Sequence, residues 1–443
     1  MGSGTTLQYS DVSDIGLRRH KNQDSHAVLA PWSREQFRRT GWLFVVADGM
    51  GAHAAGETAS DLAAKTVPQA YQRLAARSPP LALVSSIRQA NDLIHQQGEA
   101  SAELRGMGTT CTALAILPRG ALVGHVGDSR AYRIRGQTIE QFTRDHSLAW
   151  EVEERGGSPT ATPKNIITRS LGPHPNVLID WEGPFDVEEG DTFVVCSDGL
   201  SGQVADEEIG LVAGSLAPAD AVATLLGLAL VRGAPDNVTV IVARAGRHEA
   251  TDHKPGDPPW SLSEEAPEPQ AAQPLPVKSL ALAAGGLLGG LIAASLTSTA
   301  GWDAVRKGQW PASGQDGLAL LLLGGLGLVF VAAIAFALAR LLSSGTAASL
   351  VLPPGKRLGG GPYRSFSCQP SPALLDGIIA SLDSAAEGVD EAAGESYLAE
   401  VAVARAAAAR GDVPEALAAV QRGLARYRQA VEAGRQQQPP AND

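Results

Sequence analysis

The feature that most constrains how this chain can fold is a set of four aspartates, each placed in a short turn of small residues. Three of the turns adjoin short apolar runs of the kind that form buried strands. Carboxylates at the ends of neighbouring strands project toward one place, so we expect the fold to gather them. The four are Asp24 in NQDS, Asp48 in ADGMG, Asp198 in CSDGL and Asp236 in PDNVTV.

A cluster of carboxylates in one small volume needs a partner of opposite charge. Like charges cannot share such a volume unless protons or a cation neutralise them. A site made only of oxygen atoms favours Mg²⁺ or Mn²⁺. The aspartates therefore predict a divalent metal site, and they favour hydrolytic chemistry.

Composition excludes several other classes of protein. The chain of 443 residues has a net charge of −11 and no basic stripe, which argues against nucleic-acid binding. Its three cysteines, Cys111, Cys196 and Cys368, show no C-x-x-C spacing, which argues against disulfides and a thiolate zinc site. The N-terminus has no signal-peptide pattern, so we expect the first 250 residues to remain in the cytoplasm.

Residues 5–247 are predicted to form one α+β domain. Short turns join several of the strand-like runs, which favours antiparallel sheet over alternating parallel units. We expect strands at 42–47, 110–117, 121–126, 130–135, 177–182, 192–196 and 238–244, and helices at 57–74, 81–97, 148–155 and 218–231.

A change of composition after this domain predicts a linker and then a membrane hairpin. Residues 248–277 are acidic and rich in proline, as in disordered linkers. Within 278–343, the segments 279–300 and 317–342 are apolar and long enough to span a bilayer. The basic residues around them favour both ends on the cytoplasmic side of a bacterial inner membrane. A pair of buried helices in a soluble domain is the alternative.

The end of the chain is predicted to be a small helical tail. Residues 344–370 are expected to be a second linker, and residues 371–434 are alanine-rich and periodic, with a break at 410–412. Part of this tail resembles a tetratricopeptide helix pair, although a lone repeat has no neighbours to cover its apolar face. A plain helical hairpin is the alternative, and in either case the tail is a candidate site for a protein partner.

Six short motifs follow one another in a fixed order along the first domain. They are D-x-G-x-x-R-x-x-N-x-D from Asp14 to Asp24, ADGMG, GTT at 108–110, GDSR at 127–130, SDGL and PDN. This series resembles the metal-dependent protein phosphatases, the type 2C serine/threonine family, over almost all of residues 5–246. The resemblance does not extend to the membrane or tail regions.

The resemblance implies a β-sandwich of two antiparallel sheets flanked by helix pairs, with two Mn²⁺ or Mg²⁺ ions at one end. It also implies a role for individual residues, and Arg19 would hold the phosphate in a forked contact. Asp48 would bridge the ions, Gly49 would offer its carbonyl, Asp198 and Asp236 would ligate one ion, Asp24 would hold a coordinated water, and Asp128 would bind a third ion.

Some residues depart from the family pattern or allow a second interpretation. Gln23 stands where many members carry Glu, and Met50 stands where eukaryotic members often place a histidine that acts as an acid. Asp14 and Asn22 are equally suited to capping turns. His20, His53 and His146 are alternative acids, although a lone histidine in a polar turn is more often structural. Residues 142–173 occupy the place of the family's mobile flap.

The sequence thus predicts a membrane-tethered phosphatase that removes phosphate from serine and threonine residues of phosphorylated proteins. Its substrates would be the targets of a serine/threonine kinase, or the kinase itself. The alternative is a catalytically degenerate sensor or scaffold that signals through the hairpin and the tail.

Overall fold

The structure is a computed structural model that describes residues 6–51, 55–157, 163, 166–251, 258–262, 307–308, 351–386 and 391–437. The chain divides into two units, one made of Met1–Leu262 with Val351–Asp443 and one of Ser263–Leu350. The two predicted membrane segments, 279–300 and 317–342, and most of the linker before them lie outside the described residues. Among the residues that are described, no helix is both long and apolar enough to cross a membrane.

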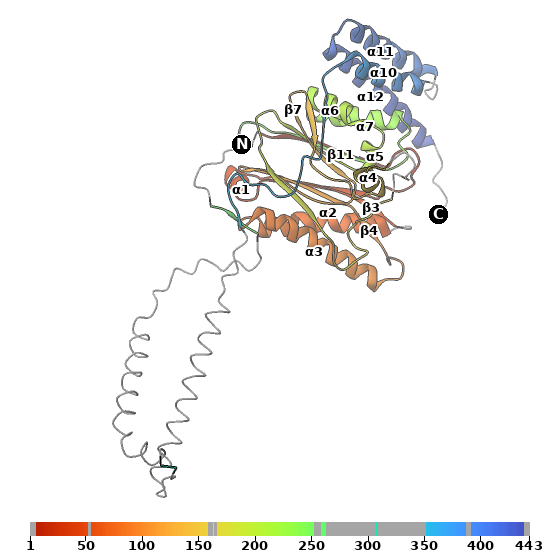
Figure 1. Ribbon diagram of the computed structural model, residues 1–443. Helices are drawn as coiled ribbons and strands as arrows, with labels where there is room; N and C mark the ends of the chain where they lie inside the picture. Colours follow the sequence, from red (N-terminus) through yellow and green to blue (C-terminus); the bar gives the residue numbers. More distant parts are fainter. Residues whose placement is uncertain are drawn as a thin grey trace. The chain divides into compact units, whose positions relative to one another are not determined.

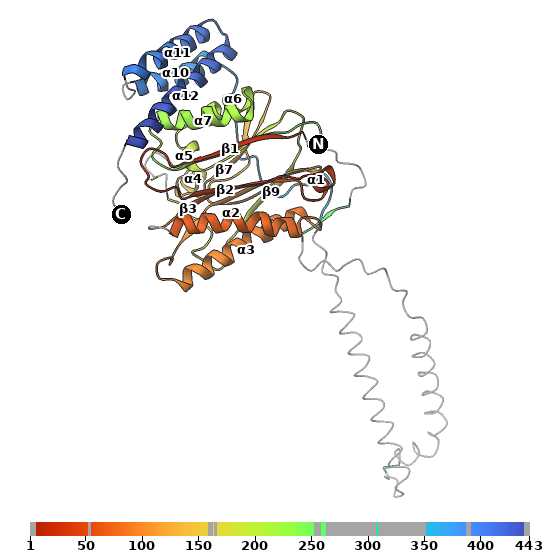
Figure 2. The same cartoon turned by 180° about the vertical axis from the view of Figure 1, so that it is seen from behind.

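Two antiparallel sheets form the centre of the first unit, which confirms the predicted α+β class (Figures 1 and 2). One sheet has the order β2 (Asp24–Leu29), β3 (Trp42–Met50), β5 (Cys111–Leu117), β6 (Gly120–Val126) and β9 (Asp180–Phe185), with β4 (Gly108–Thr109) beside β3. The other has the order β1 (Gln8–Asp14), β11 (Val238–Arg244), β10 (Thr192–Cys196), β7 (Arg130–Arg135), β8 (Thr138–Gln141) and β14 (Arg364–Ser367).

Helices cover the outer faces of both sheets. The pair α2 (Ala55–Leu74) and α3 (Pro79–Ala100) lies on the sheet that contains β3, and the pair α6 (Asp206–Ser215) and α7 (Pro218–Val231) lies on the other (Figure 2). A third apolar cluster fills the space between the sheets. Strands β5 and β6 are buried along their whole length, which explains their mainly apolar sequences. The remaining helices of the domain are α1 (Arg34–Thr40), α4 (Leu148–Glu154) and α5 (Asp198–Ser201).

Several elements were not predicted because their sequences are polar or short. Strand β1, with the sequence QYSDVSD, is only partly buried and pairs along its full length with β11, from Gln8 opposite Arg244 to Asp14 opposite Val238. The hydrogen bonds of that ladder form irrespective of side-chain polarity. Strands β2 and β8 and helices α1, α5 and α6 were missed in the same way.

The C-terminal residues are part of the same compact unit as the two sheets, and this corrects the expected boundaries. The expected linker 344–370 contains β14, which pairs with β8 from Arg364 opposite Gln141 to Ser367 opposite Thr138. The tail itself has three helices instead of one hairpin, namely α10 (Pro372–Ala385), α11 (Glu391–Ala409) and α12 (Val413–Gln437).

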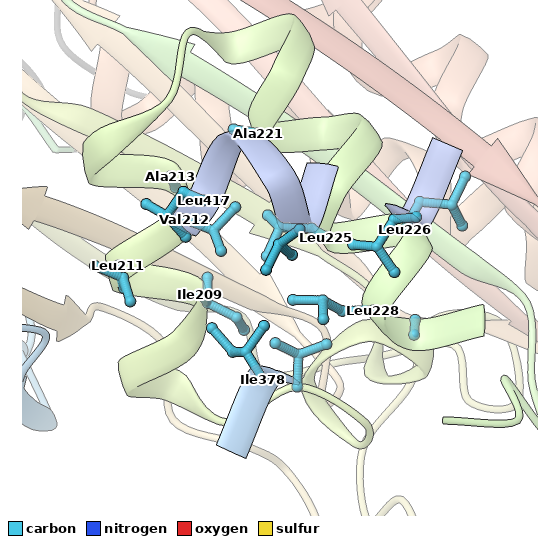
Figure 3. Close-up of a cluster of buried hydrophobic side chains, with 14 of the residues drawn as sticks. Ile209, Leu211, Val212, Ala213, Ala221, Leu225, Leu226, Leu228, Ile378 and Leu417 are labelled. Carbon is cyan, nitrogen blue, oxygen red and sulfur yellow. The ribbon is translucent and has the colours of Figure 1, made fainter. Parts of the chain in front are cut away.

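The apolar face of the tail is covered by the outer helices of the domain. In Figure 3, the side chains of Ile378 and Leu417 from the tail lie among those of Ile209, Leu225 and Leu228 from α6 and α7. The approach is close, because a Cβ added at Gly227 would lie 2.8 Å from the Cβ of Leu424 on α12. Helix α7 thus supplies the neighbour that a lone helix pair would lack.

Within the first unit, a short ladder joins the residues just before Leu262 to those that begin at Val351. Strand β12 (Trp260–Ser261) pairs antiparallel with β13 (Val351–Leu352), with Trp260 opposite Leu352. The chain therefore leaves the first unit and returns to it at one place.

Candidate metal centre and active site

Asp24 and Asp48 are brought together by the register of two neighbouring strands. They stand directly opposite each other in the ladder between β2 and β3. Asp48 is fixed further by Thr110, whose hydroxyl accepts from the Asp48 amide at 2.9 Å and whose own amide donates to the Asp48 carbonyl at 2.9 Å. The GTT motif thus positions the backbone that carries Asp48.

Asp198 and Asp236 come from the adjacent strands β10 and β11 of the other sheet. Asp198 is the first residue of α5, directly after β10, and Asp236 precedes β11. Their motifs are in direct contact, because a Cβ added at Gly199 would lie 1.9 Å from the carbonyl oxygen of Asn237. Only glycine allows the SDG turn to lie this close to the PDN turn.

Asn237 holds the loop that connects β1 and β2. Its Nδ2 donates to the carbonyls of Ile15 at 2.9 Å and Lys21 at 3.0 Å, and its Oδ1 accepts from the Gln23 amide at 2.8 Å. Asn22 also caps a turn, since its Oδ1 accepts from the Asp24 amide at 3.1 Å. Sequence reasoning noted the PDN motif but gave Asn237 no part in the site.

Arg19 lies at the edge of this cluster. Its Nη2 donates to Asp236 Oδ2 at 2.7 Å, while 49% of its side chain is exposed. Because about half of the Arg19 side chain is exposed, an incoming anion can reach its guanidinium.

Asp128 lies in the turn between β6 and β7, and His146 supports that turn. His146 Nδ1 accepts from the Gly127 amide at 3.0 Å, so in the neutral ring the proton is on Nε2, which donates to Asp180 at 3.0 Å. Burial lowers the pKa of His146, in agreement with the neutral form. His146 therefore has a structural part, His20 is exposed, and His53 lies outside the described residues.

The carboxylates strongly perturb one another. Burial raises the pKa of Asp24 to about 7 and that of Asp128 to about 8, and the charge of Asp198 adds to both shifts. Burial and the charge of Asp24 hold the pKa of Asp48 well above its usual range. Burial and the charge of Asp236 raise the pKa of Asp198 as well.

The oxygen atoms of this cluster suit a divalent cation. Oδ1 of Asp24, of Asp128 and of Asp198 is buried without a hydrogen-bond partner, which is costly in the absence of a positive charge. As the side chains stand, the described residues include no group of three or more Asp, Glu, His or Cys side chains that could hold a metal ion. The residues therefore fit a divalent cation by the chemistry of their oxygen atoms.

A cleft of about 500 Å³ opens at the aspartates. Arg130 of the GDSR motif lies in its wall and is held by Asp145, through Nε at 3.0 Å and Nη2 at 2.7 Å. Sequence reasoning did not single out Arg130 or Asp145, although Arg130 stands in the GDSR motif and Asp145 in the flap region 142–173. The lining residues are Asp128, Arg130, Asp145, Ser147, Ala149, Trp150, Glu153, Asp198, Gly199, Ser201, Gly202, Gln203, Pro235, Asp236 and Arg364.

Known proteins resemble this chain over the same domain. The family model for Protein phosphatase 2C matches residues 18–227. Protein phosphatase PhpP of Streptococcus pneumoniae is 34% identical over 260 residues, which cover 55% of this chain and 100% of that protein. Serine/threonine protein phosphatase PstP of Mycobacterium tuberculosis is 34% identical over 245 residues, covering 54% of this chain and 45% of that protein.

A solved structure is similar over the same part of the chain. It is the catalytic domain of PstP in complex with two manganese ions, with 36% identity and a TM-score of 0.45, covering 54% of this chain and 98% of the other.

The chain belongs to the protein phosphatase 2C family. It is a serine/threonine protein phosphatase and a metal-dependent hydrolase of the bacterial type.

Proposed function

We propose that this phosphatase hydrolyses phosphoserine and phosphothreonine on cytoplasmic or membrane proteins, in opposition to a serine/threonine kinase, and that two Mn²⁺ or Mg²⁺ ions serve the reaction. The observation that carries this proposal is the cluster of aspartates at the cleft, with three orphaned carboxylate oxygens. A degenerate sensor would have no need to retain a set of carboxylates that raise one another's pKa.

The proposed roles divide between cation binding and phosphate binding. Asp48, Asp198 and Asp236 would hold the ions, with Gly49 offering its carbonyl, and Asp128 would hold a further ion. Asp24 accepts a hydrogen bond from the Ser197 hydroxyl at 2.8 Å, which leaves its other oxygen for a water. When bound, divalent cations supply a water of lowered pKa and screen the charge of the phosphate.

Arg19 is proposed to orient the phosphate. Its planar guanidinium can contact two phosphate oxygens at once. The ion pair with Asp236 already holds this guanidinium beside the carboxylates. Phosphate binding would replace Asp236 as its partner while Asp236 turns to a cation.

The test of this function is phosphate release by the full chain from a phosphothreonine peptide. We expect release with Mn²⁺ or Mg²⁺ and its loss after chelation, with recovery when the ion is returned. A phosphotyrosine peptide of the same sequence is the matched control substrate. Undiminished release in the presence of excess chelator would contradict the proposal.

We also propose that residues 278–343 tether the enzyme to the inner membrane, with the catalytic domain and tail in the cytoplasm. Two observations support it, namely the apolar segments 279–300 and 317–342 and the ladder of β12 with β13, through which the chain leaves and returns at one place. Both ends of the segment then lie on the same side of the membrane.

Membrane association can be measured by cell fractionation. We expect the full chain in the membrane fraction and its release by detergent but not by high salt. Replacing residues 265–348 with a short Gly/Ser linker should move the protein to the soluble fraction and preserve phosphatase activity, since β12 and β13 already hold the two ends together. Recovery of the full chain in the soluble fraction would refute tethering.

A further inference from the structure

The segment that follows β13 is fixed firmly against the phosphatase domain. The Tyr363 amide donates to the Gln141 carbonyl at 2.8 Å, and the Cys368 amide donates to the Gln137 carbonyl at 2.9 Å. The buried carboxylate of Glu182 accepts from the Gly361 amide at 2.9 Å and from the Tyr363 hydroxyl at 2.6 Å. These contacts set the position of β14 at the edge of the sheet.

The first residue of β14 reaches the cleft. The guanidinium of Arg364 lies 4.0 Å from the ring centroid of Trp150 on α4, and its Nη2 forms an ion pair with Glu153 on the same helix. Arg364 lines the same cleft as Asp198 and Asp236. A residue from far outside the matched region 18–227 is thus part of the active-site wall.

Arg364 differs from Arg130, the other arginine that lines the cleft, in how exposed its side chain is and in how many of its nitrogens are engaged. Of the described lining residues, five carry a carboxylate and two are arginines. An acidic peptide is therefore repelled by most of the wall and attracted only beside an arginine or a bound metal ion. Arg130 is 16% exposed, and all three of its nitrogens are engaged by Asp145, Tyr132 and Asp206. Arg364 is 27% exposed, and its ion pair with Glu153 uses Nη2 alone.

The ion pair with Glu153 shows that the Arg364 guanidinium can bind a carboxylate. The carboxylate of Glu153 is half exposed, so it can turn into solvent at little cost when another carboxylate arrives. Arg19 is the cation bonded to the aspartate cluster, whereas Arg364 is held by α4. Arg364 is therefore placed for a side chain near the phosphorylated residue and not for the phosphate itself.

We propose that Arg364 determines substrate specificity by binding an acidic side chain of the peptide beside the phosphorylated residue. This inference rests on the proposed phosphatase function. Stacking on Trp150 holds the guanidinium in the wall of the cleft. Glu153 pairs with this guanidinium when no substrate is bound. The segment beyond the predicted hairpin thereby completes the substrate site of a domain that precedes the hairpin.

The test compares two phosphothreonine peptides that differ only in having glutamate or glutamine on both sides of the phosphothreonine. In the full chain, Arg364→Ala should lower kcat/KM for the glutamate peptide by about tenfold, as expected for the loss of a charged hydrogen bond. It should change kcat/KM for the glutamine peptide and for p-nitrophenyl phosphate by no more than about twofold.

The matched variant Glu153→Gln removes the internal competitor. It should raise kcat/KM for the glutamate peptide severalfold and leave the glutamine peptide unchanged. If the ion pair of Glu153 with Arg364 were merely structural, both variants would shift activity on all three substrates in the same direction, and that result would overturn the inference.

The outcomes also separate this inference from the proposed function. Wild-type protein without metal-dependent activity on any of the three substrates would refute the proposed function. Full wild-type activity with the same peptide preference in Arg364→Ala would refute the role of Arg364 alone.

Discussion

Replacing Asp198 with asparagine should abolish metal-dependent phosphate release, with kcat/KM lowered roughly 1,000-fold, since metal catalysis is worth several kcal/mol of transition-state stabilisation. Asparagine preserves the size of the side chain but removes the negative charge. The Oδ1 atom of Asp198 is one of the three orphaned oxygens, and this change replaces a charged carboxylate at the proposed cation site with a neutral amide. Phosphate release from a phosphothreonine peptide at saturating Mn²⁺ measures the effect.

Thermal unfolding distinguishes loss of metal binding from loss of folding. In the presence of chelator, Asp198→Asn should unfold at a temperature no lower than wild type, because burial and the charge of Asp236 already disfavour the ionised form of Asp198. Added Mn²⁺ should stabilise wild type clearly and the variant much less. The control Asp61→Asn, at an exposed ion pair on α2, should behave as wild type. An Asp198→Asn variant with wild-type activity would eliminate Asp198 as a ligand.

Replacing Leu417 with alanine should destabilise the phosphatase domain itself by about 2–5 kcal/mol. Leu417 lies on α12, is 1% exposed, and belongs to the same apolar cluster as Leu225 and Leu228 of α7. Figure 3 shows Leu417 among side chains of α6 and α7, so the shorter side chain would leave a cavity at the junction of tail and domain. Unfolding in urea followed by tryptophan fluorescence measures the loss.

Tryptophan is a suitable probe because residues 351–443 contain none, so its signal reports the rest of the chain. The matched control is Leu398→Ala on α11, where half of the leucine is exposed and little should change. If Leu417→Ala left the tryptophan transition unmoved, the tail would be folding independently of the phosphatase domain.

The sequence was most informative about the centre of the domain and about its chemistry. The mainly apolar runs of β3, β5, β6, β10 and β11 predicted these strands, because most residues on both of their faces are buried. The turns at their ends carry Asp48, Asp128, Asp198 and Asp236, which the structure brings into electrostatic contact. Their assignment as metal ligands stays a prediction.

Sequence reasoning was weakest where an element is stabilised by its neighbours. Strand β1 is polar and gains its conformation from the ladder with β11. Strand β14 is short, and its position comes from β8 and from the hydrogen bonds to Glu182. No local pattern connects Arg364 with Trp150, because more than two hundred residues separate them in the chain.

The sequence by itself determined the kind of protein this is, because strand-forming runs and a fixed order of aspartate turns are local properties that can be read from a single chain. Only the tertiary structure decided that the C-terminal helices cover α6 and α7 and that Arg364 enters the cleft. Those contacts depend on which apolar and polar surfaces meet after the chain has folded back on itself, and that is a property of the packed molecule and not of any segment.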